Sequence, residues 1–204
     1  MLAGKGDISV ERLARAAKEF GADEAKVIDI EHVVVDPRVR LKCLVPLCDS
    51  YGRHLMCPPN LMSTQEFADI LKRYRKALIV QVETDYDSAD IEGGKLNRRT
   101  CDEREASTDT REWKTRLHEL VNRVEAAAFK EGCYLAAGLI GGSCALCPEC
   151  VSHQIGEPCG HPFEARPSME AMGIDVLKTC ENAGLPLSLS SKEKVRWTGL
   201  ILLD

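Results

Sequence analysis

Seven of the ten cysteines in this chain of 204 residues are gathered in two short segments. In the second segment, Cys144, Cys147 and Cys150 are each separated by two residues, and Cys159 follows nine residues later. Thiolates two residues apart on a turning loop can face a common centre, because the backbone curls and points its N–H groups at the sulfurs. The spacing therefore predicts a metal or iron–sulfur site with these four cysteines as ligands.

The identity of the metal depends on how many of these cysteines bind it. Three cysteines at this spacing are typical of a bacterial ferredoxin-type loop, in which a [4Fe–4S] cluster takes its fourth cysteine from elsewhere. Zinc instead prefers four ligands in a tetrahedron, and His153 and His161 also lie in this segment. The alternative is a zinc site with these ligands: Cys147, Cys150, Cys159 and His161. Zinc would leave one of the closely spaced cysteines unused, so the pattern favours the cluster.

The first segment contains Cys43, Cys48 and Cys57 at wider spacing. Three cysteines can hold a [4Fe–4S] cluster only with one iron left open, and an open iron can bind a substrate or water. We therefore expect any catalysis to lie here. Two alternatives remain. These cysteines could join the second group around one shared site, or they could be reduced cysteines in a core, although their Pro, Gly and polar neighbours argue against a core.

Four cations accompany the first segment. Arg38, Arg40 and Lys42 precede Cys43 directly, and Arg53 lies between the second and third cysteines. Cations at these positions would offset the charge of a thiolate-bound cluster or hold an anionic ligand. The alternative for the basic stretch before Cys43 is the solvated face of a strand.

Charge and hydropathy narrow the cellular setting. The net charge of −5 argues against nucleic acid as a partner. The longest apolar runs, residues 134–140 and 200–203, are too short to span a membrane. The N-terminal residues contain no apolar signal core. We therefore expect a cytoplasmic protein whose cysteines bind metal rather than form disulfides.

Hydrophobic periodicity predicts one domain over residues 1–204, in which strands and helices alternate. Helices are expected over residues 10–20, 63–74, 111–130 and 168–184. Strands are expected over residues 26–30, 32–35, 77–82, 133–140 and 195–203. The alternation favours an α/β layered domain with a mixed, partly parallel sheet, flanked by helices and carrying two cysteine-rich metal-binding loops.

The three remaining cysteines are expected to play no part in metal binding. Residues 84–110 lack periodicity and predict a mobile connection, so Cys101 is expected to be an exposed free thiol. Cys133 begins an apolar strand and Cys180 lies on the apolar face of a helix, so both are expected in the core.

Several motifs follow one another along most of the chain. They are Arg-Val-Arg-Leu-Lys-Cys at 38–43, Leu-Met-Cys-Pro-Pro-Asn at 55–60, Cys-Ala-Leu-Cys-Pro-Glu-Cys at 144–150, Pro-Cys-Gly-His-Pro at 158–162, Arg-Pro-Ser-Met-Glu-Ala-Met-Gly-Ile at 166–174 and Trp-Thr-Gly at 197–199. In this order they resemble the family of predicted metal-binding proteins, a domain of unknown function found mainly in anaerobic bacteria and archaea. The resemblance covers residues 38–204. It implies metal binding by the seven clustered cysteines and suits oxygen-sensitive clusters.

Three functions fit these observations. The first is an iron–sulfur protein with one or two [4Fe–4S] clusters that serves anaerobic metabolism as a redox or electron-transfer accessory and meets a redox protein partner. The second is an enzyme that uses an open-site cluster for sulfur removal or substrate activation. The third is a zinc-stabilised binding module. The sequence does not decide whether the protein is an enzyme.

Overall fold

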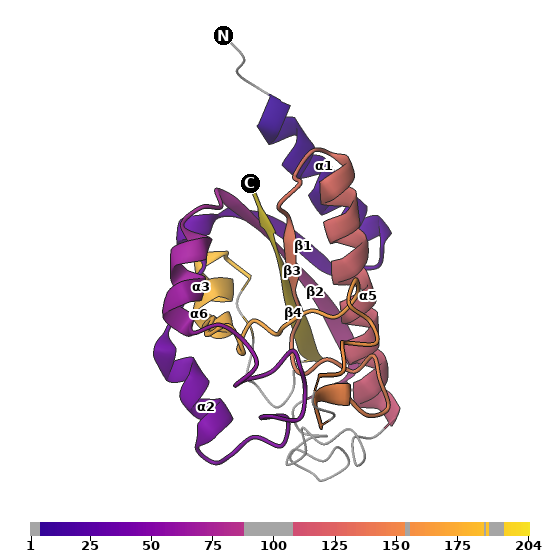
Figure 1. The fold of residues 1–204 in the computed structure, drawn as a ribbon. Helices are drawn as coiled ribbons and strands as arrows, with labels where there is room; N and C mark the ends of the chain where they lie inside the picture. The colour runs from indigo at the N-terminus through magenta and orange to yellow at the C-terminus, as the bar shows by residue number, and fades with distance from the viewer. Residues whose placement is uncertain (1–4, 88–107, 154–155, 186, 188–193) are drawn as a thin grey trace.

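A single four-stranded sheet forms the centre of the protein. The computed structural model describes residues 5–87, 108–153, 156–185, 187 and 194–204 (Figure 1). The strands are β1 (Glu24–Asp29), β2 (Lys76–Asp87), β3 (Ala137–Leu139) and β4 (Lys194–Leu203). Their order across the sheet is β1-β2-β4-β3, and each strand is antiparallel to its neighbours.

The expectation of a mixed, partly parallel sheet is therefore wrong. β2 and β3 are joined through a long helix and point in the same direction, as a strand–helix–strand unit predicts. They are not neighbours, however, because β4 lies between them and pairs with both in the opposite direction. The predicted α/β layering is confirmed, with an all-antiparallel sheet.

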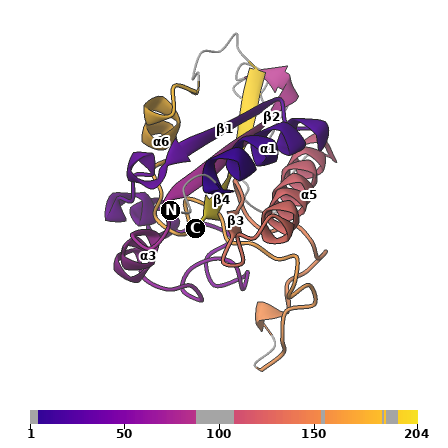
Figure 2. The same cartoon turned by 90° about the horizontal axis from the view of Figure 1, so that it is seen from above.

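Both faces of the sheet are covered by helices (Figure 2). One face packs against α1 (Lys5–Glu19) and α5 (Thr108–Lys130), and the other against α3 (Thr64–Leu71) and α6 (Val176–Asn182). The side chains of β2 and β4 alternate between the two cores, as strand geometry requires. Leu78, Val80 and Ile201 lie in the first core, and Ile79 and Leu200 in the second. The prediction that residues 77–82 are buried on both faces is confirmed.

The start of α3 was predicted correctly because its capping chemistry is local. The Ser63 hydroxyl accepts a hydrogen bond from the backbone N–H of Glu66, and the Glu66 carboxylate accepts one from the N–H of Ser63. This reciprocal pair is a capping box.

Three predicted elements are shorter or different in the structure. Residues 30–32 form a 3-10 helix, η1 (Ile30–His32), and the expected strand over 32–35 is reduced to one bridge between Val35 and Ile174. The expected strand over 133–140 is shortened to Ala137–Leu139, with an isolated bridge from Ile140 to Ser168, because Gly132 has a positive φ and a turn follows α5. The expected helix over 168–184 is broken at Gly173, whose φ is +87°. It starts instead at Val176, where the Asp175 side chain caps it.

Regular secondary structure extends into both ends of the predicted connection over residues 84–110. β2 continues to Asp87 and α5 begins at Thr108, so residues 88–107, with Cys101, lie outside the described residues. Cys133 and Cys180 are buried, which confirms their expected place in the core. No helix in the described part of the chain is long and apolar enough to cross a membrane.

The two cysteine segments lie at the same end of the sheet (Figure 1). The first passes through a 3-10 helix, η2 (Pro37–Arg40), and a single helical turn, α2 (Leu41–Leu44), before its loop. The basic stretch before Cys43 is therefore helical and is not a strand face. The second segment leaves β3, and its described residues include a short 3-10 helix, η3 (Val151–His153).

We predict that the stability of the protein depends on the central strand β4. Ile201 lies on β4 and is fully buried in the core that the sheet forms with α5. Ile201→Ala should therefore lower the free energy of unfolding by about 2–5 kcal/mol. Ile70 on α3 is 42% exposed and serves as a matched control, because Ile70→Ala should cost only about 0.5 kcal/mol. Urea unfolding of the two variants measures both values, and equal losses would contradict the proposed core.

Candidate metal centre

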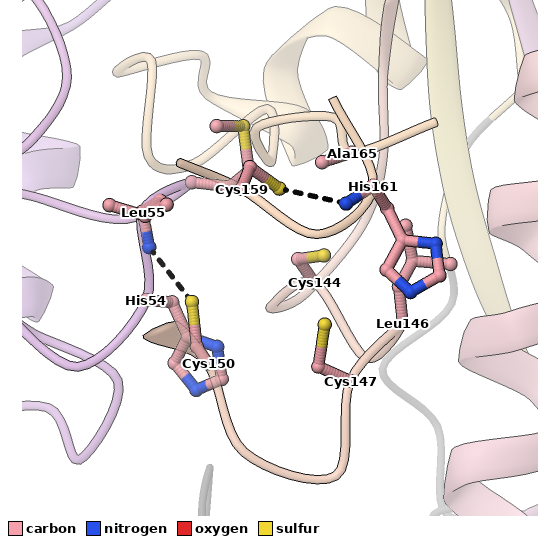
Figure 3. Close-up of a pocket in the computed structure, with 10 residues that line it drawn as sticks. His54, Leu55, Cys144, Leu146, Cys147, Cys150, Cys159, His161 and Ala165 are labelled. Atoms are coloured by element: carbon pink, nitrogen blue, oxygen red, sulfur yellow. Dashed lines mark hydrogen bonds between the residues drawn. The ribbon is translucent and has the colours of Figure 1, made fainter. Parts of the chain in front are cut away.

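Four of the seven clustered cysteines line one small cavity. Cys144, Cys147, Cys150 and Cys159 all face it, and their sulfurs surround a common space (Figure 3). All four thiols are half-buried. The structure therefore brings together the four residues that the spacing grouped as one site.

The first cysteine segment supplies the opposite wall of this cavity. His54, Leu55 and Met56 line it, although they lie about ninety residues earlier in the chain than Cys144. Two hydrogen bonds join the segments: the Leu55 N–H donates to Cys150 Sγ at 3.4 Å, and the Ser152 hydroxyl donates to the Arg53 carbonyl oxygen. The two cysteine segments are thus joined by these hydrogen bonds, and both contribute to the lining of the cavity.

Backbone N–H groups point at three of the sulfurs. In addition to the Leu55 contact, the His161 N–H donates to Cys159 Sγ at 3.4 Å, and the Leu146 N–H interacts with the Cys144 thiolate. Such donors stabilise negative charge on sulfur, and around an iron–sulfur cluster they raise its reduction potential. Apolar side chains of Leu55, Leu146 and other residues limit the access of water.

The surroundings of Cys144 disfavour its thiolate form. Burial, together with the negative charges of Cys159, Cys147 and Cys150, raises the pKa of Cys144 to about 11, although the Leu146 N–H lowers it. A bound metal cation removes this penalty, because it attracts all four thiolates at once. The electrostatics of the cavity therefore favour metal binding.

The donor set fits a metal, but the cavity must adjust to receive it. Among the described residues, no three or more His, Cys, Asp or Glu side chains are already arranged to hold a metal ion. The cavity measures about 20 Å³, close to the size of one water molecule. The thiols must therefore move outward for a cluster, or regroup around a single ion.

A histidine also lines the cavity and has a carboxylate partner. His161 Nδ1 lies 2.9 Å from Glu164 Oε2, and both belong to the second cysteine segment. Metal-binding histidines commonly have such a partner, which orients the ring. The sequence pattern had already placed His161 among the possible zinc ligands.

Helix α5 holds the end of the second segment in place. The guanidinium of Arg166 donates two hydrogen bonds to the Glu125 carboxylate, at 2.7 and 2.8 Å. The same carboxylate accepts the Gly138 N–H of β3 at 2.6 Å. A Cβ at position 138 would lie 2.5 Å from Glu125 Oε2, so a glycine is needed for this close approach. One carboxylate on α5 thus connects the sheet to the residue that closes the cysteine segment.

Two further side chains of α5 bind the backbone of this segment. The ring Nε2 of His118 and the side-chain amide of Asn122 both donate to the Glu164 carbonyl oxygen, at 2.8 and 3.0 Å. Burial lowers the pKa of His118, so its ring is neutral near pH 7 and must carry its hydrogen on Nε2. The segment is therefore anchored on three successive turns of α5.

The three cysteines of the first group do not line this cavity. Cys43 and Cys48 are neighbours, since the Cys48 N–H donates to the Cys43 carbonyl oxygen at 3.1 Å. Burial and the Cys48 charge raise the pKa of Cys43, while Arg40 lowers it. Cys57 is more deeply buried than either. Whether these three share a second metal site stays a prediction.

The four predicted cations have different surroundings. Arg40 donates to the carbonyl oxygens of Ala171 and Met62, at 2.7 and 3.3 Å, and so helps to fix the backbone. Arg38 pairs with Asp36. Arg38 and Lys42 both line a second, larger cavity, and the Arg53 backbone joins the two cysteine segments.

Sequence reasoning missed the residues that complete the small cavity. They are His54, Leu55, Met56, Leu146 and Ala165. Three of them lie directly before Cys57, so their position beside a cysteine was the only available signal. That signal pointed to the first cysteine group and not to the second.

Comparison with known proteins gives one match. The family described as "Predicted metal-binding protein (DUF2284)" matches residues 26–203. No curated protein and no solved structure matches the chain. The match extends over the sheet and both cysteine segments.

We predict that the Arg166–Glu125 pair stabilises the metal segment. Both side chains are mostly buried, at 16% and 20% exposure, so Arg166→Met leaves the Glu125 carboxylate without the cation of its ion pair and should cost about 3 kcal/mol. The matched control is Arg196→Met, which breaks a pair with Glu83 that is nearly 40% exposed and should cost about 1 kcal/mol or less. Urea unfolding compares the two variants. Equal losses would show that the Arg166 pair is no more than a surface contact.

We predict that the Cys144 thiol ionises unusually late when the metal is removed. In the folded, metal-free protein its alkylation rate should reach half-maximum near pH 11, against about pH 9 in the urea-unfolded chain, because only the thiolate reacts. The raised pKa makes the neutral thiol the stable form of the fold, so this contribution to stability is present below pH 9 and is lost as the pH rises through 11. Mass spectrometry after iodoacetamide labelling measures both titrations. Coincident curves would contradict the prediction.

Proposed function

The chain belongs to the family of predicted metal-binding proteins, and on this premise we propose that Cys144, Cys147, Cys150 and Cys159 hold a [4Fe–4S] cluster. The observation that carries the proposal is the shared cavity of these four thiols. A cluster binds one thiolate at each of its four irons and so uses the whole set. A single zinc ion bound by thiolates alone would also take four, but it would require their sulfurs to converge on one point.

The surroundings of the sulfurs support a redox role. Backbone N–H donors reach Cys144, Cys150 and Cys159, and apolar side chains limit the access of water. Hydrogen bonding and burial are two of the factors by which a protein sets the potential of a cluster. Four cysteines leave no iron open for a substrate, so the centre would transfer electrons rather than bind a reactant.

We propose that the protein is an electron-transfer or redox accessory that exchanges electrons with a protein partner. The four cysteine residues are half-buried, and the cluster would therefore lie close to the surface. Large aliphatic side chains of Leu44, Val45 and Leu47 are exposed on the neighbouring first segment. Exposed apolar groups beside a redox centre suit a transient protein contact.

A zinc-stabilised binding module is the second candidate, and one observation favours it. His161 lines the cavity with Glu164 bound to its Nδ1, which leaves Nε2 available for a metal. In that case His161 would replace one cysteine as a ligand, and the protein would have no redox activity.

The first cysteine group could hold a second, open-cornered cluster. The nearness of Cys43 to Cys48 is compatible with it, and an enzyme that removes sulfur or activates a substrate would then be the third candidate. The iron content separates this case from a single cluster.

We predict that protein purified without oxygen is brown and contains about four irons and four acid-labile sulfides per chain. Cys147→Ser or Cys150→Ser should abolish the visible absorbance and lower stability, because binding of the metal and folding of the loop are coupled. Cys101→Ser is the matched control and should change neither property.

The alternatives give different results in the same assay. About eight irons per chain would indicate a second cluster in the first group. One zinc per chain without sulfide would overturn the proposal, and loss of that zinc in His161→Ala would establish the binding module in its place.

A further inference from the structure

A larger cavity lies next to both cysteine segments. Its volume is about 550 Å³, within the range of small-molecule sites. One wall comes from η2 and α2, with Arg38 and Lys42. Another comes from the N-terminal half of β4, with Trp197. Lys42 precedes Cys43 directly, and the lining residue Gly141 lies three positions before Cys144. A molecule bound here would therefore contact residues that lie close to both segments in the sequence.

The aromatic wall of this cavity is held rigidly. A Cβ on Gly142 would lie 2.8 Å from Cζ3 of Trp197, and a Cβ on Gly141 would lie 2.8 Å from the Thr198 carbonyl oxygen. Only glycines allow the chain to pass so close to β4. The Lys114 ammonium lies 5.7 Å from the centre of the Trp197 ring. The ring is thus fixed between the glycine pair and α5, as a preformed binding surface requires.

Most charges that line the cavity are already paired within the protein. Arg38 binds Asp36, Arg196 binds Glu83, and the Asp175 side chain caps α6. Among the described residues that line the cavity, the other two ionisable side chains are Lys42 and Glu170, and the charge of Lys42 acts on Glu170.

Glu170 has unused hydrogen-bonding capacity. Its carboxyl group interacts with the Ser168 hydroxyl and with the N–H groups of Gly142 and Glu170 itself, but Oε2 accepts no hydrogen bond and is shielded from solvent. Burial raises the pKa of this carboxyl group, and the Lys42 charge lowers it. A buried carboxyl oxygen without a partner is costly, and a ligand that moved the neighbouring cavity wall and donated a hydrogen bond to the group would remove the cost.

We propose that this cavity binds a small organic acid that also carries an amine or hydroxyl group. The acid group would pair with Lys42 at the rim, and the donor would meet the Glu170 carboxyl group deeper inside. Val39, Ile174 and Trp197 would contact the carbon chain between them. The proposal does not depend on which metal the four thiols hold.

Calorimetric titration of the anaerobically purified, metal-loaded protein tests this. Three probes carry both groups: L-malate, L-serine and γ-aminobutyrate. Butyrate and butylamine each carry one group. At least one two-group probe should bind, and γ-aminobutyrate should bind more tightly than either single-group probe. If no two-group probe binds, or if butyrate binds as tightly as γ-aminobutyrate, the proposal is overturned.

Variants locate the binding. Lys42→Met and Glu170→Met should each weaken binding about tenfold or more, since a hydrogen bond to a charged group contributes at least that factor. Lys72→Met is the matched control, because Lys72 is an exposed lysine at the C-terminal end of α3 that pairs with Asp69 and does not line the cavity. The affinity of this variant for the probes should not change. Glu170→Gln, which keeps an acceptor, should bind better than Glu170→Met.

Unchanged affinity in both Lys42→Met and Glu170→Met would overturn the assignment of the cavity. Metal analysis of the same samples keeps the two proposals separate. If the probes bind to protein that contains zinc in place of iron, the cluster proposal is refuted and the proposed binding site is supported. If the protein contains iron but binds none of the two-group probes, the cluster is supported and the proposed binding site is refuted.

Discussion

The cost of placing a thiolate in a half-buried cavity is the constraint around which this end of the protein is built. Burial raises the pKa of the Cys144 thiol, and the negative charges of the three neighbouring cysteines add to this effect. The chain offers backbone N–H groups to three of the sulfurs, but dipoles alone do not neutralise four charges. A metal cation does, and its binding energy can then stabilise a segment with little regular secondary structure. Folding of the cysteine segment and binding of the metal are thus thermodynamically coupled.

The rest of the fold supplies rigid supports for that segment. β3 gives it a starting point, and α5 holds its end through Arg166 and through two donors to the Glu164 carbonyl oxygen. These supports come from elements buried on the sheet, where packing fixes the side chains. The first cysteine segment then closes the cavity from the other side. The site is therefore a contact between two loops, and the sheet sets their separation.

Features that depend on neighbouring residues could be predicted from the sequence. The capping box at Ser63, the two-sided burial of β2 and the grouping of the four cysteines all follow from spacings of a few residues. The helix expected from Ser168 failed because Gly173 adopts a left-handed conformation, and a single glycine does not reveal its φ. Contacts between distant residues were beyond prediction. Nothing in the sequence indicated that Leu55 would donate to Cys150, or that the C-terminal strand would separate β2 from β3.

The interior position of β4 has a consequence for the order of biosynthesis. β4 is the last element of the sheet to be synthesised, yet it pairs with strands on both sides. Until it emerges from the ribosome, β2 and β3 each have an open edge, and the core residues they share with β4 stay uncovered. α5 then has no finished sheet to pack on, so its anchors cannot fix the cysteine segment. Metal insertion would consequently follow the emergence of β4, when the sheet that supports the cysteine segment can close.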